Sequence, residues 1–196
     1  MEISPVILVG QHVRLEPLSL THTQELIQAA ADGELWTSTV TIIPTREQMA
    51  AYIEAALQGQ AKGQELPFVI VRRQSGQVVG TTRFYNIKSA DRSAAIGYTW
   101  LSHSAQRTSV NTECKLLLLS HAFEHWNCVR VELITDVLNE QSRAAILRLG
   151  AKQEGIFRNH MIMPDGRLRD SVCFSIIKGE WPEVRRGLLA KLEQTA

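Results

Sequence analysis

The stretch IGYTWLSHSAQRTSVNTECKLLLL, residues 96–119, holds the residues best placed to do chemistry. A strand is predicted to end at Leu101, a loop of small polar residues follows, and a helix is predicted to begin near Thr112. The first backbone N–H groups of a helix lack partners and carry the positive end of its dipole, so a loop such as residues 106–111 can wrap a pyrophosphate. Arg107 adds a full positive charge. These residue types predict an anion site.

A second candidate is the string His121-Ala122-Phe123-Glu124-His125, which fits the H-x-x-E-H pattern of inverted zincins on a predicted helix. A zinc hydrolase needs both histidines on one face and a third protein ligand farther along the chain. No second half of that signature follows, and strings of this length occur by chance. Histidines on a helix surface are the favoured interpretation, and no metal is expected.

The three cysteines, Cys114, Cys128 and Cys173, are widely spaced and lie in apolar segments. This arrangement is typical of reduced thiols in a core and not of a disulfide framework. We therefore expect the cysteines to fill the core without a catalytic role.

Hydrophobic periodicity predicts a scaffold of mixed α/β character for these residues. The first half predicts a strand or hairpin (6–15), helices (21–33 and 45–59) and three antiparallel strands (66–73, 78–87 and 93–101). The second half predicts a helix (112–126), a strand (129–136), a helix (141–149), two strands (154–163 and 169–177) and a last helix begun by Pro182. Because no repeat or linker interrupts the chain, a single domain over residues 1–196 is expected.

Composition narrows the choice of partners. A chain of 196 residues can bury a core without disulfides or a structural metal. Its 21 basic and 20 acidic residues leave a net charge of +1, which gives no footprint for a polyanion, so nucleic acid is not an expected partner. No basic leader and no apolar run of roughly 18 residues is found, so we expect a cytoplasmic protein without a membrane partner.

The loop from Gln106 to Asn111 resembles the acetyl-CoA pyrophosphate loop of GNAT acetyltransferases, whose core pattern is Gln/Arg-x-x-Gly-x-Gly/Ala. The chain resembles in particular the RimJ/RimL-like branch, and the resemblance covers nearly its whole length. The segments that carry it are GYTWL (97–101), VNTE (110–113), HAFE (121–124), LGAKQEGIFRNHM (149–161) and EWPEV (180–184). The resemblance implies a mostly antiparallel sheet, flanked by helices and splayed between its fourth and fifth strands, with the pantetheine arm in the cleft.

The resemblance also implies which residues hold the coenzyme. Trp100 and Leu101 would offer backbone groups to the pantetheine amides, and Asn139 would contact the arm. Ser142, in the motif N-x-x-S, would protonate the departing thiolate, although a serine there could equally cap the short helix. The pyrophosphate would be held by Gln106, Arg107, Thr108, Ser109, Val110, Asn111 and Thr112.

Two of these positions depart from the family pattern. Ser109 stands where glycine is expected, and Asn111 stands where a small residue is expected, close to phosphate. A serine can still fit if its φ is negative, and asparagine tolerates left-handed backbone better than most residues. Both side chains could donate hydrogen bonds to phosphate oxygens.

The general base is not supplied by the resemblance. Ribosomal-protein acetyltransferases carry a glutamate at the position that matches Met161, which cannot take a proton. Another side chain or water must then accept the proton of the amine. His160 is the leading candidate, because imidazoles titrate near neutral pH, and Glu113 and Asp170 are the others.

The acceptor side is expected to lie beside the meander and the first helices. Tyr85 is expected to orient the substrate from its strand, and Arg83 and Trp36 are expected to border the pocket, since the first two helices wall it in the family. Trp36 fits the core equally well.

The sequence thus predicts an N-acetyltransferase that moves acetyl from acetyl-CoA to a primary amine, on a protein N-terminus or a small molecule, by direct attack. The alternative is a fold of this kind that holds acyl-CoA as a sensor or scaffold without turnover. A homodimer is also expected, from the family habit of pairing through the C-terminal strands. Trp181, Leu188, Leu189 and Leu192 form its candidate apolar patch, with packing inside one chain as the alternative.

Overall fold

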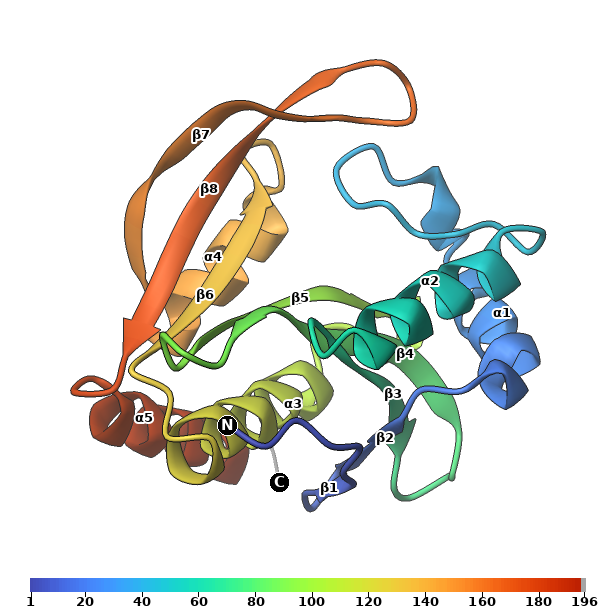
Figure 1. Ribbon diagram of the computed structural model, residues 1–196. Helices are drawn as coiled ribbons and strands as arrows, with labels where there is room; N and C mark the ends of the chain where they lie inside the picture. The colour runs from blue at the N-terminus through green and yellow to red at the C-terminus, as the bar shows by residue number, and fades with distance from the viewer. Residues whose placement is uncertain (195–196) are drawn as a thin grey trace.

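The computed structural model describes residues 1–194. Its centre is an eight-stranded sheet in the order β1-β2-β3-β4-β5-β6-β8-β7 (Figure 1). Within these residues only the β5–β6 pair is parallel, and the others are antiparallel, so the predicted mixed sheet is confirmed. The strands are β1 (Leu8–Val9), β2 (Val13–Pro17), β3 (Leu66–Arg72), β4 (Val78–Lys88), β5 (Ser93–Leu101), β6 (Arg130–Asp136), β7 (Lys152–Ile162) and β8 (Leu168–Ile177).

Helices cover both faces of the sheet (Figure 1). They are α1 (Thr23–Ala31), α2 (Met49–Ala61), α3 (Ser109–Ser120), α4 (Glu140–Leu149) and α5 (Trp181–Glu193), with the short turns η1 (Leu20–His22), η2 (Leu35–Thr37), η3 (His103–Ala105) and the π-helical η4 (His121–His125). One core lies between α1, α2 and the face of β3 that carries Val69. The other lies between α3 and the face that carries Phe68 and Phe84, and it continues under α4 and α5. Each fully buried side chain of this size contributes about 1.5–3 kcal/mol.

The sheet opens between β5 and β6. Their parallel pairing runs from Ser93 opposite Arg130 to Ile96 opposite Leu133, and no pairing follows, although β5 continues to Leu101. This is the predicted splay between the fourth and fifth strands, if the two-residue β1 is not counted. A backbone edge of β5 is therefore left without a strand partner at this end.

A backbone irregularity at Gly97 and Tyr98 accompanies the opening. Tyr98 has a φ of +50°, a left-handed value that is rare for an aromatic residue. The register of β4 against β5 shifts at the same place. A Cβ atom on Gly97 would lie 2.7 Å from Cε1 of Tyr85, so only glycine lets that ring lie beneath the strand.

Several helix ends differ from those expected. The third helix begins at Ser109 and not near Thr112, because Thr108 caps it. The second begins at Met49, four residues after the expected start at Thr45. There the predicted capping pair forms one contact, in which the N–H of Thr45 donates to Oε1 of Gln48 at 3.2 Å. Short turns with their own capping bonds thus precede the helices, and spacing alone does not show them.

The C-terminal helix uses its apolar residues inside the chain. Trp181 stacks on Phe123 with ring centroids 5.4 Å apart, and its indole N–H donates to Glu124 at 2.9 Å. Leu188 is fully buried, while Leu189 is 37% exposed. The predicted apolar patch was therefore wrong for Trp181 and Leu188, and intramolecular packing is correct for both.

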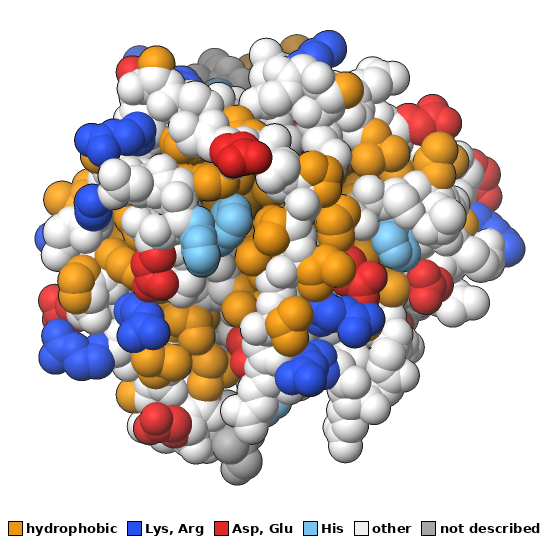
Figure 2. All heavy atoms as spheres, turned by 60° about the horizontal axis from the view of Figure 1, so that its bottom comes forward, with side chains coloured by type: hydrophobic (Ala, Val, Ile, Leu, Met, Phe, Trp, Pro, Cys, Tyr) orange, Lys and Arg blue, Asp and Glu red, His pale blue; other side chains and the backbone are white. Residues whose placement is uncertain are grey.

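Charged side chains of both signs are interspersed on the face that Figure 2 shows. This matches the near balance of 21 basic and 20 acidic residues. Within residues 1–194, no helix is long and apolar enough to cross a membrane.

Glu113 holds the N-terminal hairpin against α3. Its two carboxylate oxygens accept the backbone N–H groups of Gln11, His12 and Val13, each at 2.7 Å. Gly10 is required beside it, because a Cβ there would lie 2.4 Å from Cδ of Glu113. Glu113 is only 4% exposed, so its predicted role in substrate binding or as a base is replaced by a structural one.

We expect Glu113→Ala to lower the free energy of unfolding by about 3 kcal/mol, because three backbone donors lose a charged acceptor in a poorly solvated site. Urea denaturation measures the difference. Glu54→Ala, on the exposed surface of α2, is the matched control and should stay within about 0.5 kcal/mol of the parent protein. A Glu113 variant as stable as this control would contradict the anchoring role.

Candidate functional site

The predicted anion loop lies between η3 and α3. The hydroxyl of Thr108 accepts the N–H of Val110 at 3.3 Å and donates to the carbonyl of Ala105 at 2.7 Å. The side-chain amide of Gln106 donates to the carbonyl of Leu101 at 3.0 Å, which ties the loop to the end of β5. The unpaired N–H groups of the first turn of α3 are therefore held on a fixed loop beside the opening of the sheet.

The left-handed residue of this loop is Arg107, with a φ of +59°. That conformation costs a non-glycine residue about 1 kcal/mol, and it leaves an exposed guanidinium at the loop. Ser109 and Asn111 lie in helical backbone without positive φ, and Thr112 follows in the same turn. Ser109 therefore has the negative φ that lets a serine take the position where the family pattern has glycine.

The N-terminus of α4 lies at the same end of the sheet. Oδ1 of Asn139 accepts the N–H of Ser142 at 2.9 Å, so Asn139 caps α4 and the cap expected as an alternative role of Ser142 was wrong. Nδ2 of Asn139 donates to the hydroxyl of Thr41 at 3.1 Å. The side chains of Gln141 and Gln106 meet at 3.4 Å. This contact joins the loop before α3 to the first turn of α4.

The backbone of Trp100 and Leu101 borders this region from β5. The Trp100 side chain is buried against α1 and α2, so only its backbone is available to a ligand. On the β4 edge, Gly80 comes so close that a Cβ would lie 2.0 Å from the carbonyl oxygen of Trp100. The opposite edge, toward β6, has no strand partner in the described part of the chain.

Arg83 lies under the irregular part of β5. Its side chain is 4% exposed, and Nη1 donates to Glu65 at 2.7 Å. The guanidinium lies 4.0 Å from the ring centroid of Tyr98 and 5.0 Å from that of Tyr52. Among the residues described, Nε and Nη2 of Arg83 and the hydroxyl of Tyr52 have no hydrogen-bond partner. Arg83 thus supports the site from within and does not line it.

Tyr85 and Tyr98 meet edge to face, with centroids 5.3 Å apart. Burial raises the pKa of both phenols above the ordinary value, so both hydroxyls remain neutral donors at physiological pH. Tyr98 is 49% exposed. The pair therefore offers an aromatic surface and phenol donors on the side where β5 leaves β6.

His160, the leading candidate for the base, is held by the neighbouring strand β8. Its Nδ1 lies 3.0 Å from the hydroxyl of buried Ser171. Nε of Arg169 donates to the same hydroxyl at 2.9 Å. The ring also lies 5.2 Å from that of Phe157. One serine thus fixes both an imidazole and a guanidinium.

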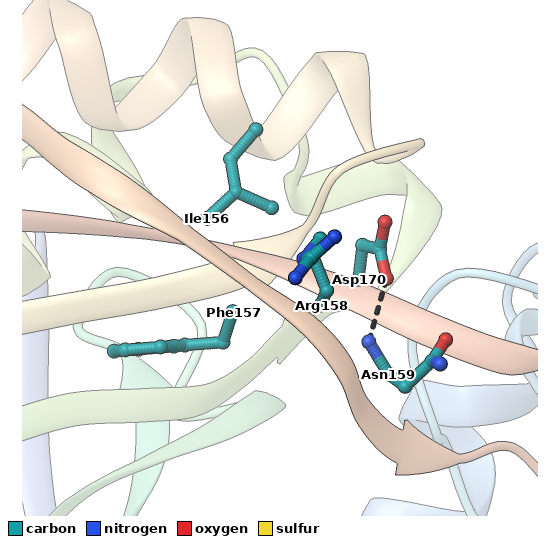
Figure 3. Close-up of a pocket in the computed structure, with 5 residues that line it drawn as sticks. All are labelled: Ile156, Phe157, Arg158, Asn159 and Asp170. Atoms are coloured by element: carbon teal, nitrogen blue, oxygen red, sulfur yellow. Dashed lines mark hydrogen bonds between the residues drawn. The ribbon is translucent and has the colours of Figure 1, made fainter.

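Asp170, another candidate base, is used within the β7–β8 hairpin. Its Oδ1 accepts the N–H of Asn159 at 2.7 Å, beside a pocket that Arg158 also lines (Figure 3). Trp36 lies in η2 with 36% of its surface exposed, so it is at the connection of α1 to α2 and not in the core. Among the described residues, neither side chain forms a hydrogen bond or ion pair with His160 or Tyr85.

The H-x-x-E-H segment forms η4 and packs internally. His121 stacks on His125 with centroids 5.3 Å apart, and burial lowers the pKa of His121 to about 4. Glu124, the acid of the pattern, accepts from Trp181 and pairs with Arg185 at 3.4 Å. No group of three or more potential metal ligands occurs among the described residues. Cys114, Cys128 and Cys173 are all free and buried.

Comparison with known proteins identifies the family. The family model "Acetyltransferase (GNAT) domain" matches residues 12–152, and the chain belongs to that family. The Bacillus subtilis protein named "Putative ribosomal N-acetyltransferase YdaF" is 32% identical over 54% of this chain and 57% of its own length, little more than half.

Solved structures share the fold. A GCN5-related N-acetyltransferase from Brucella melitensis is 30% identical, covers 96% of this chain and 86% of its own, and superposes with a TM-score of 0.86. Mycobacterium smegmatis RimJ, solved with CoA-disulfide, covers 95% of each chain at a TM-score of 0.82, and its 22% identity supports the fold alone. The predicted superfamily is confirmed, and the ribosomal relative supports the RimJ/RimL-like branch.

Tyr98, Arg169 and Lys115 were missed at the sequence level. Alternation along residues 169–177 could have placed Arg169 beside Ser171. Lys115 shares a face of α3 with Leu118 and Leu119, a helical spacing that could have indicated burial. Its Nζ donates to the hydroxyl of Thr99 at 2.8 Å.

We expect the pH dependence of stability to reveal Lys115. Burial lowers the pKa of its ammonium to about 8 from the ordinary 10.5, and the one titratable neighbour with an effect, Cys114, stays neutral. Between these two values the unfolded chain binds the extra proton, so folding stability rises with pH. Lys115→Met should be more stable at pH 7 by up to about 3 kcal/mol, with the difference vanishing near pH 10.5. A pH-independent difference in urea melts of the two proteins would be inconsistent with a strained buried cation.

Proposed function

We propose that this protein is an acetyl-CoA-dependent N-acetyltransferase acting on primary amines. The observation that carries the proposal is the opening between β5 and β6, where the N-termini of α3 and α4 lie at one end and are joined through Gln106 and Gln141. Two helix N-termini favour the negative charge of a pyrophosphate. Membership of the GNAT family supports the reaction class.

The residues present fit coenzyme A. The exposed Arg107 and the N–H groups of residues 109–112 would bind phosphate oxygens, and the free edge of β5 at Trp100 and Leu101 would pair with the pantetheine amides. Asn139 keeps one amide hydrogen for the arm after its bond to Thr41. The bound coenzyme supplies an activated acyl thioester. The RimJ structure solved with CoA-disulfide supports the assignment by fold.

Proton transfer in this proposal falls to His160 and Ser142. The imidazole of His160, oriented by Ser171, takes a proton from the acceptor ammonium, directly or through water, and leaves a neutral amine. The hydroxyl of Ser142 has no hydrogen bond to the described residues and is free to donate to a departing thiolate, while its N–H is fixed by Asn139. Tyr85 and Tyr98 would border the acceptor.

The alternative is an acyl-CoA sensor without turnover. It is favoured by Met161, which lies where the ribosomal-protein enzymes carry a glutamate. The two functions share the coenzyme site and differ only in whether an amine is acetylated. Release of the coenzyme thiol in the presence of an amine distinguishes the acetyltransferase from the sensor.

Calorimetric titration with acetyl-CoA tests the coenzyme site. We expect Arg107→Ala to weaken binding about tenfold, because one phosphate contact with a full charge is lost. Arg186→Ala, an exposed position on α5, removes the same charge away from the site and should leave Kd unchanged. Failure of the parent protein to bind acetyl-CoA would refute the proposed function.

A thiol-release assay on peptides and small amines tests the chemistry. We expect His160→Gln and Ser142→Ala each to lower kcat by about 100-fold, because each removes one proton transfer, and to leave the Kd of acetyl-CoA within twofold. Turnover that is unchanged in both variants would assign proton transfer to water. Binding of acetyl-CoA without release of thiol for any amine would favour the sensor.

A further inference from the structure

Within residues 1–194, one face of β6 and β8 carries no helix beside the candidate site (Figure 1). Val131 and Leu133 of β6 pack into the core with Ile146 of α4. Alternation places Glu132, Ile134 and Asp136 on the opposite face, together with their partners Ser175, Cys173 and Ser171 on β8. In the described chain, α4 contacts β6 from the core side, and no helix lies over the opposite face (Figure 1). Ser171, Cys173, Ser175 and Asp136 are themselves buried, so a ligand on this face would contact the longer side chains such as Glu132 and Arg169.

Two arginines at one end of this face share a single carboxylate. Asp136 is fully buried, and its Oδ2 lies 2.5 Å from Nη2 of Arg167, which also donates to the carbonyl of Thr39 at 2.9 Å. The nearest approach of Arg169 to Asp136 is 4.0 Å, from Nε. Asp136 therefore pairs mainly with Arg167, and its single negative charge leaves the two arginines together with a net positive charge.

The free end of Arg169 is available to a ligand. Nε is engaged with Ser171, while neither Nη atom forms a hydrogen bond within residues 1–194. Its side chain is 13% exposed, so the planar fork is largely desolvated yet still reachable. Desolvation lowers the pKa of Arg169, whereas Asp136 and the two tyrosines, Tyr85 and Tyr98, act on it electrostatically in the other direction.

The other charges of this face do not compensate Arg169. Arg83 is matched by Glu65, and at the far end Arg130 is shared by Glu132 and Glu154. The face thus has an excess of positive charge at Arg169 and an excess of negative charge at Arg130. An acceptor that carries both an amine and an acid has the complementary distribution.

The position of Arg169 connects it to the proposed chemistry. His160 and Arg169 contact the same hydroxyl of Ser171, at 3.0 and 2.9 Å. A group bound to Arg169 would place an amine attached a few bonds away near the imidazole. An arginine fork is well suited to a carboxylate, which it can bind through two parallel hydrogen bonds.

We propose that Arg169 is the specificity residue of the acceptor site and binds a carboxylate adjacent to the amine that is acetylated. The inference rests on the proposed acetyltransferase function. The acceptor class is then an amine with a neighbouring acid, either a free amino acid or a peptide N-terminus followed by an acidic side chain.

Steady-state thiol release with matched acceptors tests the proposal. One pair is an α-amino acid and its carboxamide, and the other is a pentapeptide with Asp or Asn at its second position. The parent protein should prefer the acid over the neutral partner by at least tenfold in kcat/KM in one pair, and that pair identifies the source of the carboxylate. In Arg169→Gln, KM for the acid should rise at least tenfold, while kcat/KM for the neutral partner changes less than threefold.

Three controls make the result decisive. Arg158→Gln removes an arginine from β7 in the pocket beside Asp170 and should keep the preference for the acid (Figure 3). Arg169→Lys keeps the charge without the fork and should restore part of the preference, and an unchanged Kd for acetyl-CoA shows that each variant is folded. The inference would be overturned, and the proposed function kept, by equal kcat/KM values for acid and neutral acceptors in the parent protein. Equal losses of kcat/KM for both acceptors in Arg169→Gln would have the same meaning. Absence of turnover with every acceptor would overturn the proposed function as well.

Discussion

The separation of β5 from β6 after Ile96 is the constraint on which the rest of the structure depends. Backbone donors and acceptors that leave a sheet must find other partners, or be kept for a ligand, because unpaired buried groups are costly. Here the inner edge of β5 receives one substitute bond, from Gln106 to Leu101. The remaining edge is compatible with an extended amide-bearing arm, which is how an irregularity in the sheet becomes a binding surface.

The two sides of this opening are linked by a small number of polar contacts. Asn139 caps α4 and also holds Thr41 in the connection between α1 and α2. Arg167 joins the tip of the β7–β8 hairpin to Thr39 in the same connection. The segment that would wall the acceptor side is therefore fastened to both the coenzyme side and the hairpin. Its geometry depends on contacts between residues about 100 or more positions apart in sequence.

The distance in sequence between contacting residues explains which features of the fold and the site could be predicted from the sequence. The order of elements and the loop at residues 106–111 depend on local periodicity and capping, and both could be predicted. The face that a strand residue occupies depends on register, and a change of one residue reverses it. Asp170 was considered as a base and Arg169 was overlooked for that reason. Glu113 was misjudged because its partners at residues 11–13 are distant in sequence.

The unpaired end of β5 is also fixed from both faces of the sheet. On one face the ring of Tyr98 lies 4.0 Å from the guanidinium of Arg83, and on the other the hydroxyl of Thr99 accepts from Lys115 and contacts that of Thr82 at 2.8 Å. A strand edge held only by its β4 neighbour could close onto β6, whereas side chains anchored in opposite directions resist that movement. Burying the cations of Arg83 and Lys115 is costly, and each has few hydrogen-bond partners. The cost is reasonable if the opening must already exist before a ligand arrives, because a preformed site spends less of its binding energy on rearrangement.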